Sequence, residues 1–315
     1  MNYITFTKEL EKNIKKKLGK QYQVSIEHVL KNNGLTKDAI LIRENNSNIS
    51  PNIYLEHFYD RYCECESLDE ISEEIMVSYQ EALIQKPTDI EDCFHFQKYK
   101  EKIFFRIVHL ESNKTLLENI PHIPYLDLAI TFHCMVSDES MQMKFFTISN
   151  LLLKEWELSI DALYQIALEN TQKLFPAHMD TLEHIMEALL RNTHSYQSLF
   201  PVTDFESELS NIPDDPNLQI FVITNQYGVN GASVILYPDL LDCIAQKLQS
   251  DLYLLPSSIH EFLVLPADST IYSTLVNMVS EVNTHEVADD DILSNQVYFY
   301  NWKEHTLTEK ANSNN

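Results

Sequence analysis

The sequence predicts an α+β fold of two lobes, in which mixed or antiparallel sheets pack against helices. Amphipathic segments with an apolar residue every three or four positions are interspersed with shorter runs of β-favouring residues. Asn32–Gly34 separates two such runs and has the residue types of a tight hairpin turn, which indicates antiparallel pairing. The 315 residues are 44% hydrophobic and 10% aromatic, so the chain is long and apolar enough for two cores.

Residues 1–92 are predicted to form a helix–hairpin–helix lobe. The first helix should end near Gly19, because apolar side chains recur at every fourth position before it. These positions are Phe6, Leu10, Ile14 and Leu18. Strands are expected at 22–30 and 38–43, and Ser67–Glu70 has the spacing of a capping box at the start of a second helix.

A central α+β region is predicted over 93–191. Three apolar runs predict strands, although the first could equally belong to a buried helix, because a short apolar run does not separate the two. These runs are 103–108, 126–136 and 143–148. Ser159 should cap a helix at 160–171, and Asp180 with Glu183 a helix that ends at Leu190. Residues 192–217 contain prolines and no sustained period, which predicts a connection.

A C-terminal α+β lobe is predicted over 218–305, with a flexible tail at 306–315. Strands are expected at the β-favouring runs 218–224, 232–236, 252–255, 259–265 and 296–302. Pro238 suits the first turn of a helix with one apolar face, and a further helix should follow at 271–282. Pro256–Ser258 is the expected turn between the third and fourth strands.

Charge limits the partners of the chain. There are 23 basic and 47 acidic side chains, a net charge of −24. Nucleic acid phosphates and anionic membranes repel such a chain, so we expect no nucleic acid binding and no membrane contact. No run approaches the roughly 18 apolar residues that cross a bilayer, and charges interrupt any signal-peptide pattern, which predicts a cytoplasmic protein. The five cysteines are irregularly spaced, so reduced thiols are expected.

One cluster has the residue types of a hydrolase site. A hydroxyl nucleophile, a base and an acid fall within five positions, at Ser257, Ser258, His260 and Glu261. These four are candidate catalytic residues, because such groups support acyl transfer when they converge. A distant residue such as Asp127 or Asn283 would have to complete the site. Side chains of neighbouring strand residues point to opposite faces, which favours a structural role for the cluster.

A second cluster has the residue types of a zinc site. The candidate ligands are Cys63, Cys65, Cys93 and His95. The single residue between the first two cysteines is shorter than the usual gap of about two to four residues, which favours ordinary reduced cysteines. The four glycines of the chain form no phosphate-binding loop, so no nucleotide or other cofactor is expected.

Seven short motifs follow one another along nearly the whole chain. They are Lys31–Gly34, Asn52–Tyr59, Ile120–Ala129, Ala167–Thr171, Gly231–Pro238, Leu255–Glu261 and Glu281–Asn283. Their order resembles an uncharacterised domain-of-unknown-function family of gut clostridial (Firmicute) proteins, and this resemblance implies no established activity or catalytic residue. Cys63–Cys65 departs from the family, where a glycine-containing turn is expected. A more distant resemblance is to an uncharacterised Firmicute family of chaperone-like α+β proteins.

These observations predict a protein that is not an enzyme, namely a protein-interaction or chaperone-like scaffold whose acidic surface binds another protein. The absence of a strong catalytic, metal or nucleotide motif favours this hypothesis. Two alternatives stay open. One is a hydrolase that uses the cluster at residues 257–261, and the other is a phage-defence or anti-defence component that imitates nucleic acid through its acidic surface.

Overall fold

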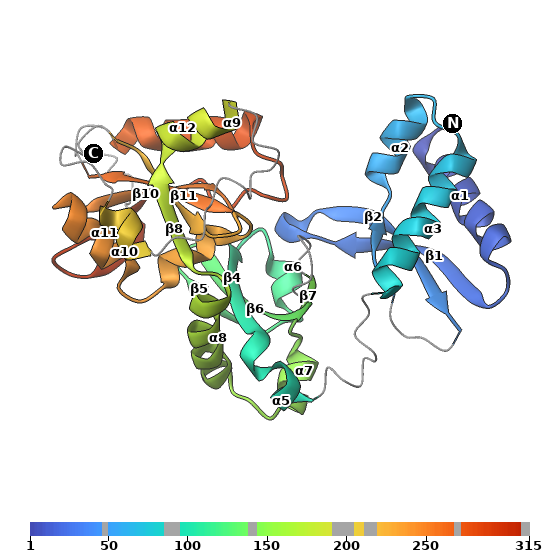
Figure 1. Cartoon of the computed structure of the whole chain (residues 1–315), viewed down its shortest axis with the longest axis horizontal. Helices are drawn as coiled ribbons and strands as arrows, with labels where there is room; N and C mark the ends of the chain where they lie inside the picture. The colour runs from blue at the N-terminus through green and yellow to red at the C-terminus, as the bar shows by residue number, and fades with distance from the viewer. Residues whose placement is uncertain are drawn as a thin grey trace. The chain divides into compact units, whose positions relative to one another are not determined.

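The computed structural model describes residues 1–45, 50–84, 95–137, 144–190, 205–210, 219–267 and 272–309. It confirms an α+β fold with antiparallel sheets (Figure 1). The chain divides into two compact units. The first comprises Met1–Tyr99 with Val136–Lys144, and the second comprises Lys100–Met135 with Phe145–Asn315. The finer division predicted from the sequence stays a prediction.

The first unit combines helices with a three-stranded antiparallel sheet of order β1-β2-β3. Its elements are α1 (Tyr3–Leu18), β1 (Tyr22–Leu30), β2 (Thr36–Glu44), β3 (Ile53–Tyr54), α2 (Glu56–Cys63), α3 (Leu68–Ile84) and α5 (Phe96–Tyr99). The predicted hairpin is confirmed, since β1 pairs with β2 from Tyr22↔Glu44 to Leu30↔Thr36. Asn33 and Gly34 take φ of 59° and 70° in the turn, a left-handed conformation that these residue types favour.

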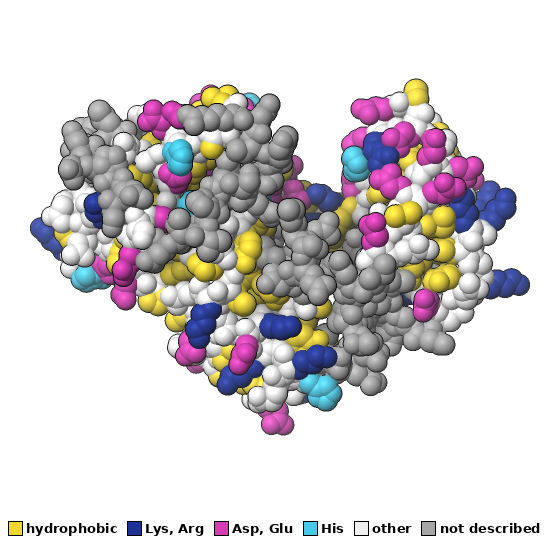
Figure 2. Space-filling model, in the orientation of Figure 1, with side chains coloured by type: hydrophobic (Ala, Val, Ile, Leu, Met, Phe, Trp, Pro, Cys, Tyr) yellow, Lys and Arg dark blue, Asp and Glu magenta, His cyan; other side chains and the backbone are white. Residues whose placement is uncertain are grey.

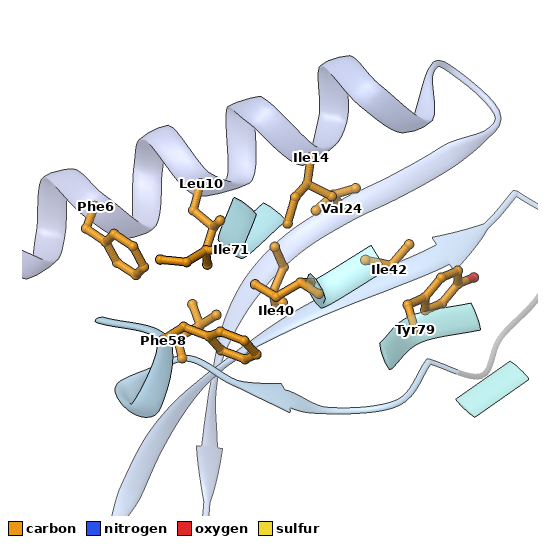
Figure 3. Close-up of a cluster of buried hydrophobic side chains, with 11 residues drawn as sticks. Phe6, Leu10, Ile14, Val24, Ile40, Ile42, Phe58, Ile71 and Tyr79 are labelled. Carbon is orange, nitrogen blue, oxygen red and sulfur yellow. The ribbon is translucent and has the colours of Figure 1, made fainter. Parts of the chain in front are cut away.

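The core of the first unit is the apolar face of α1 against the sheet and α3. Figure 3 shows Phe6, Leu10 and Ile14 of α1 pointing toward Ile40 of β2 and Ile71 of α3. All five side chains are fully buried. The four-residue spacing that predicts the helix is therefore the spacing that builds the core.

Local capping fixes the C-terminal end of α1 and the N-terminal end of α3. Gly19 ends α1 with φ 80°, where a residue with a Cβ is strained. The capping box is confirmed, because the Ser67 N–H donates to Glu70 Oε2 at 3.0 Å and the Glu70 N–H donates to Ser67 Oγ at 3.2 Å. These bonds satisfy backbone donors that the first turn of α3 leaves unpaired.

The second unit contains a four-stranded antiparallel sheet of order β4-β6-β5, with β7 also paired to β6. Its strands are β4 (Ile103–His109), β5 (His122–Tyr125), β6 (Leu128–Ser137) and β7 (Lys144–Thr147). The helices around it are α6 (Lys114–Leu117), α7 (Asn150–Glu155) and α8 (Ile160–Leu174). Ser159 caps α8 as predicted, and α8 packs on β4, where Thr171 Oγ1 accepts a 3.1 Å hydrogen bond from the Phe105 N–H.

The other sheet of the second unit has six strands in the order β13-β12-β10-β11-β9-β8 and is antiparallel. Its strands are β8 (Ala177–Thr181), β9 (Phe221–Asn225), β10 (Leu252–Ser258), β11 (Glu261–Pro266), β12 (Tyr298–Asn301) and β13 (Thr306–Glu309). The remaining helices are α9 (Leu182–Leu190), α10 (Phe205–Ser210), the 3-10 helix η4 (Gly231–Leu236), α11 (Leu240–Leu248) and α12 (Tyr272–His285).

Two predictions for this region need correction. The segment 232–236, expected as a strand, belongs instead to the 3-10 helix η4. This helix begins at Gly231, whose Cα packs against neighbouring backbone so closely that a side chain would not fit, as described below. The β10–β11 turn lies at 259–260, because Pro256 continues β10 opposite Phe262 instead of ending it. Pro256 lies beyond the part of β10 that pairs with β12, so its missing N–H leaves no ladder bond unmade there.

The predicted connection and tail also contain structure. Within 192–217 the structure describes α10, and the other residues of that stretch lie outside the described part of the chain. Residues 306–309, placed in a flexible tail by the sequence, form β13 and pair with β12 from Tyr298↔Glu309 to Asn301↔Thr306. None of the helices in the described ranges is both long and apolar enough to cross a lipid bilayer.

Candidate functional site

The four candidate residues of the predicted hydrolase meet at the tip of the β10–β11 hairpin. Ser257 and Ser258 end β10, His260 lies in the turn, and Glu261 begins β11 opposite Ser258. The His260 N–H donates to Ser258 Oγ at 3.0 Å. This hydroxyl therefore holds the turn backbone, and its hydrogen bond runs to the main chain of His260 and not to the imidazole ring.

Both ring nitrogens of His260 have partners of their own. Nδ1 accepts a 2.9 Å hydrogen bond from the Asn230 N–H, which places the ring proton on Nε2. Nε2 lies 3.4 Å from Asp291 Oδ1. A general base must contact the hydroxyl of its nucleophile through a ring nitrogen, and among the described hydrogen bonds none joins the His260 ring to Ser257 or Ser258. The geometry thus gives the cluster an architectural role, and its catalytic role stays a prediction.

The hairpin tip is held against η4 by a very close backbone approach. Thr224 Oγ1 donates to the His260 carbonyl at 2.8 Å, and the Ala232 N–H donates to the Ile259 carbonyl at 3.2 Å. A Cβ added at Gly231 would lie 2.7 Å from the His260 carbonyl oxygen and 2.6 Å from the Asn225 nitrogen. The two sequence blocks at 231–238 and 255–261 therefore form one packed unit.

The two distant residues considered for the hydrolase lie together elsewhere. Asp127 Oδ2 accepts a 2.5 Å hydrogen bond from Ser294 Oγ, and Asn283 Nδ2 donates to the Ser294 carbonyl at 2.9 Å. None of the described hydrogen bonds joins Asp127 or Asn283 to the hairpin tip.

The candidate zinc ligands do not converge within the described residues. Cys63 ends α2 and Cys65 follows it, and both are exposed free thiols. Cys65 has φ 85°, a left-handed conformation that favours glycine, and it lies in the segment where the sequence resemblance predicts a glycine-containing turn. His95 is exposed, and Cys93 lies outside the described residues. In the part of the chain that the structure describes, no group of three His, Cys, Asp or Glu side chains has the arrangement of a metal site.

A different residue of the second unit has the environment of a binding site. Three arginines lie in the described ranges, and two of them have carboxylate partners. Arg43 Nη2 lies 3.5 Å from Glu27 Oε1, and Arg61 Nη2 lies 2.7 Å from Glu66 Oε2. Arg106 on β4 has no carboxylate partner among the described residues, and its buried Nε makes no hydrogen bond there.

Aromatic rings fix the position of the Arg106 guanidinium. Its Cζ lies 3.6 Å from the ring centroid of Phe145 on β7 and 5.2 Å from that of Phe104. Phe145 is 40% exposed and Arg106 is partly exposed, so the Arg106–Phe145 pair reaches the surface. Burial lowers the pKa of Arg106 to about 9, which leaves the guanidinium charged at neutral pH.

His133 on β6 completes this cluster as a neutral side chain. Its ring lies 5.6 Å from Phe104 and 5.7 Å from Phe145, centroid to centroid. Burial, and secondarily the charge of Arg106, lower the pKa of His133 well below its usual value. The hydroxyls of Thr131 and Thr147 lie 3.0 Å from Nε2 and 3.2 Å from Nδ1, so both nitrogens have partners without a proton being added. Arg106 is therefore the charged group of the cluster, and it can bind a carboxylate or phosphate.

A comparison with protein families decides what the chain is related to. A family model matches residues 3–302, and its description is a family of unknown function, DUF5688. The chain belongs to the DUF5688 family. No curated protein and no solved structure matches it. This match confirms that the chain resembles a family of unknown function over nearly its whole length. The clostridial source of the family and the seven motifs stay predictions.

Acidic side chains on this DUF5688 protein do not gather into one track on the face that Figure 2 draws. They lie scattered over both units, with Lys and Arg side chains among them. Imitation of nucleic acid requires a regular array of carboxylates with phosphate-like spacing. That alternative function stays a prediction.

Sequence reasoning placed Arg106 within an apolar run and assigned it no role. A signal was present, because Phe104 and Val108, which share the strand face of Arg106, are also apolar, so the run places one charge on a strand that is apolar on both faces. Its isolation from carboxylates depends on β6 and β7, which the pattern of one strand does not reveal.

Proposed function

We propose that this DUF5688 protein is a protein-interaction scaffold that binds an acidic group of its protein partner at Arg106. The observation that carries the proposal is a guanidinium without a carboxylate partner in the described part of a chain with a net charge of −24. With 47 acidic side chains available, pairing would be the ordinary outcome, as it is for Arg43 and Arg61.

The energetic argument concerns the solvation of Arg106. Moving a guanidinium away from water costs free energy, and a carboxylate at hydrogen-bond distance offsets that cost. The lowered pKa of Arg106 has burial as its cause, with no compensating acid. A carboxylate supplied by a partner would both pair with the charge and satisfy donors of the guanidinium, frequently in a bidentate geometry.

The aromatic neighbours make the same site suitable for a protein partner. Arginine and aromatic residues are enriched among the residues that contribute most to protein interfaces. Phe145 offers an exposed ring beside the guanidinium, and stacking on that ring restricts the rotamers of Arg106 before binding. Less conformational entropy is then lost when the interface forms.

The experiment is affinity purification of the full-length tagged protein from its native cells under gentle lysis at low salt. A stoichiometric partner is expected with the natural chain. Arg106→Gln should weaken its binding by at least about tenfold, because a charge on the partner is left unpaired. Arg43→Gln is the matched control, since Arg43 already has an acid partner at the surface and should be neutral.

Two results would contradict the proposal. The first is a clean monomer from gentle lysis. The second is a partner that binds the Arg106→Gln and Arg43→Gln variants equally well while both remain folded by circular dichroism. Phe145→Ala provides an independent check, because it removes the exposed ring without changing the charge and should also weaken binding.

A further inference from the structure

A serine, a histidine and an aspartate converge at the C-terminal end of β4 in the second unit, and none of them belongs to the hairpin predicted as a hydrolase site. Ser112 Oγ lies 2.7 Å from His109 Nδ1, and His109 Nε2 lies 3.8 Å from Asp127 Oδ2. Ser112 is exposed, while His109 and Asp127 are partly buried. The nucleophile therefore faces solvent, and the two groups behind it are progressively more enclosed.

The hydrogen bonds of His109 establish its tautomer. The Ser112 N–H lies 3.2 Å from Nδ1 and can only donate, so Nδ1 carries a lone pair and the proton is on Nε2. The lone pair faces the Ser112 hydroxyl, and the Nε2–H faces the carboxylate of Asp127. This is the order of groups that a serine nucleophile, its general base and an orienting acid require, with the roles of the two ring nitrogens exchanged relative to the usual triad.

Asp127 is held in place by residues far along the chain. Tyr298 OH donates to Oδ1 at 2.6 Å and Ser294 Oγ donates to Oδ2 at 2.5 Å. The Leu110 N–H donates to the Asp127 carbonyl at 2.9 Å, which ties the aspartate to the end of β4. The two hydroxyl donors fix the orientation of the carboxylate, whose Oδ2 faces Nε2 of His109.

We infer that Ser112 is a nucleophile of hydrolase type, with His109 as its general base and Asp127 as a positioning residue. In the reaction with an ester, Ser112 Oγ bonds to the carbonyl carbon as its proton passes to His109 Nδ1. The carbon–oxygen bond to the leaving group then breaks, and His109 returns the proton to the departing alkoxide. Water repeats both steps and releases the acid. Activated esters are the expected substrates, because their leaving groups need the least stabilisation.

The test uses the full-length protein and a fluorophosphonate probe, which forms a covalent bond to activated serines. Mass spectrometry should find the adduct on Ser112, and Ser112→Ala should abolish it. His109→Gln, which keeps an acceptor for the turn, should slow labelling about 100-fold, the contribution of a general base. Ser258→Ala is the matched control from the other cluster and should leave labelling unchanged.

The test also distinguishes a catalytic role of His109 from a structural role, in which its hydrogen bonds to Ser112 only stabilise the turn. If the hydrogen bonds of His109 serve only the turn, one of two results is expected. Either the folded natural chain forms no adduct at Ser112, or His109→Gln is labelled as fast as the natural chain. Each of these results overturns the inference. Asp127→Asn adds a second readout. Labelling should be slower in folded Asp127→Asn, and Asp127→Glu, which keeps the carboxylate, should restore part of the rate, whereas a purely structural role would leave the rate of both folded variants unchanged.

Discussion

Gly231→Ala tests the close approach that joins η4 to the β10–β11 hairpin. The new Cβ would lie 2.1 Å from Thr224 Oγ1, 2.6 Å from the Asn225 nitrogen and 2.7 Å from the His260 carbonyl oxygen. The hydroxyl can rotate away, but the two backbone atoms cannot, so η4 and the hairpin must separate. Overpacking of this kind costs about 1–3 kcal/mol, and losing the Thr224–His260 hydrogen bond adds about 1 kcal/mol.

We therefore expect Gly231→Ala to lower the free energy of unfolding of the second unit by about 3 kcal/mol. For a domain of about 150–250 residues this corresponds to a fall in Tm of about 6–12 °C. The assay is urea unfolding followed by tryptophan fluorescence. Trp156 and Trp302, the two tryptophans of the chain, both belong to the second unit, so the signal reports on the unit that carries the substitution.

Two variants make the result decisive. Thr224→Ala removes the shortest contact but neither backbone contact, so adding it to Gly231→Ala should not restore stability. Gly19→Ala meets only a side-chain atom at 3.7 Å and should not change the fluorescence transition, because Gly19 lies in the first unit. The reasoning fails if Gly231→Ala costs less than about 1 kcal/mol, or if Thr224→Ala rescues it.

The remaining predictions concern local features of each unit. Cys65→Gly should stabilise the first unit by up to about 1 kcal/mol in urea unfolding followed by circular dichroism, since φ is 85° there, while Cys63→Gly at the end of α2 should not. The backbone hydrogen bond from Ser67 lowers the pKa of Glu70. The stabilisation by the ionised Glu70 is therefore present above about pH 4.3 and is lost as pH falls through the lowered pKa. Glu70→Gln should flatten that part of the curve of stability against pH. The pKa of His133 is also lowered, by burial first, and the unfolded chain therefore takes up its proton before the folded one. The fluorescence-monitored stability of the second unit should fall below about pH 6.5, by up to about 1.4 kcal/mol per pH unit, and His133→Gln should remove this slope.

Elements with short-range signals were predictable from the sequence. The apolar spacing of α1, the Asn33–Gly34 turn and the caps at Ser67 and Ser159 each involve residues within a few positions of one another. Hydrogen bonds and side-chain periodicity over such distances are similar in any tertiary context. The structure confirms all four.

The errors arose where a distant segment determines the local conformation. The apolar run at 232–236 has strand propensity, but Gly231 packs against the His260 carbonyl and the segment forms η4 instead. The edge strands β8 and β13 are short and partly polar, so no pattern within them predicts their pairing with β9 and β12. Tertiary contacts override weak propensity in such segments.

The sequence by itself determined the fold class, the ends of the best-capped helices, the large negative charge and the family. Only the tertiary structure decided which polar groups are satisfied. The ring nitrogens of His260 are occupied by Asn230 and Asp291, and Asp127 is held by Tyr298, in each case across long stretches of chain. Arg106 lacks an acid partner in the described structure because of what lies beside it on β6 and β7. The physical reason is that a hydrogen bond or ion pair depends on atoms within about 4 Å, and sequence spacing does not specify which distant residues come that close.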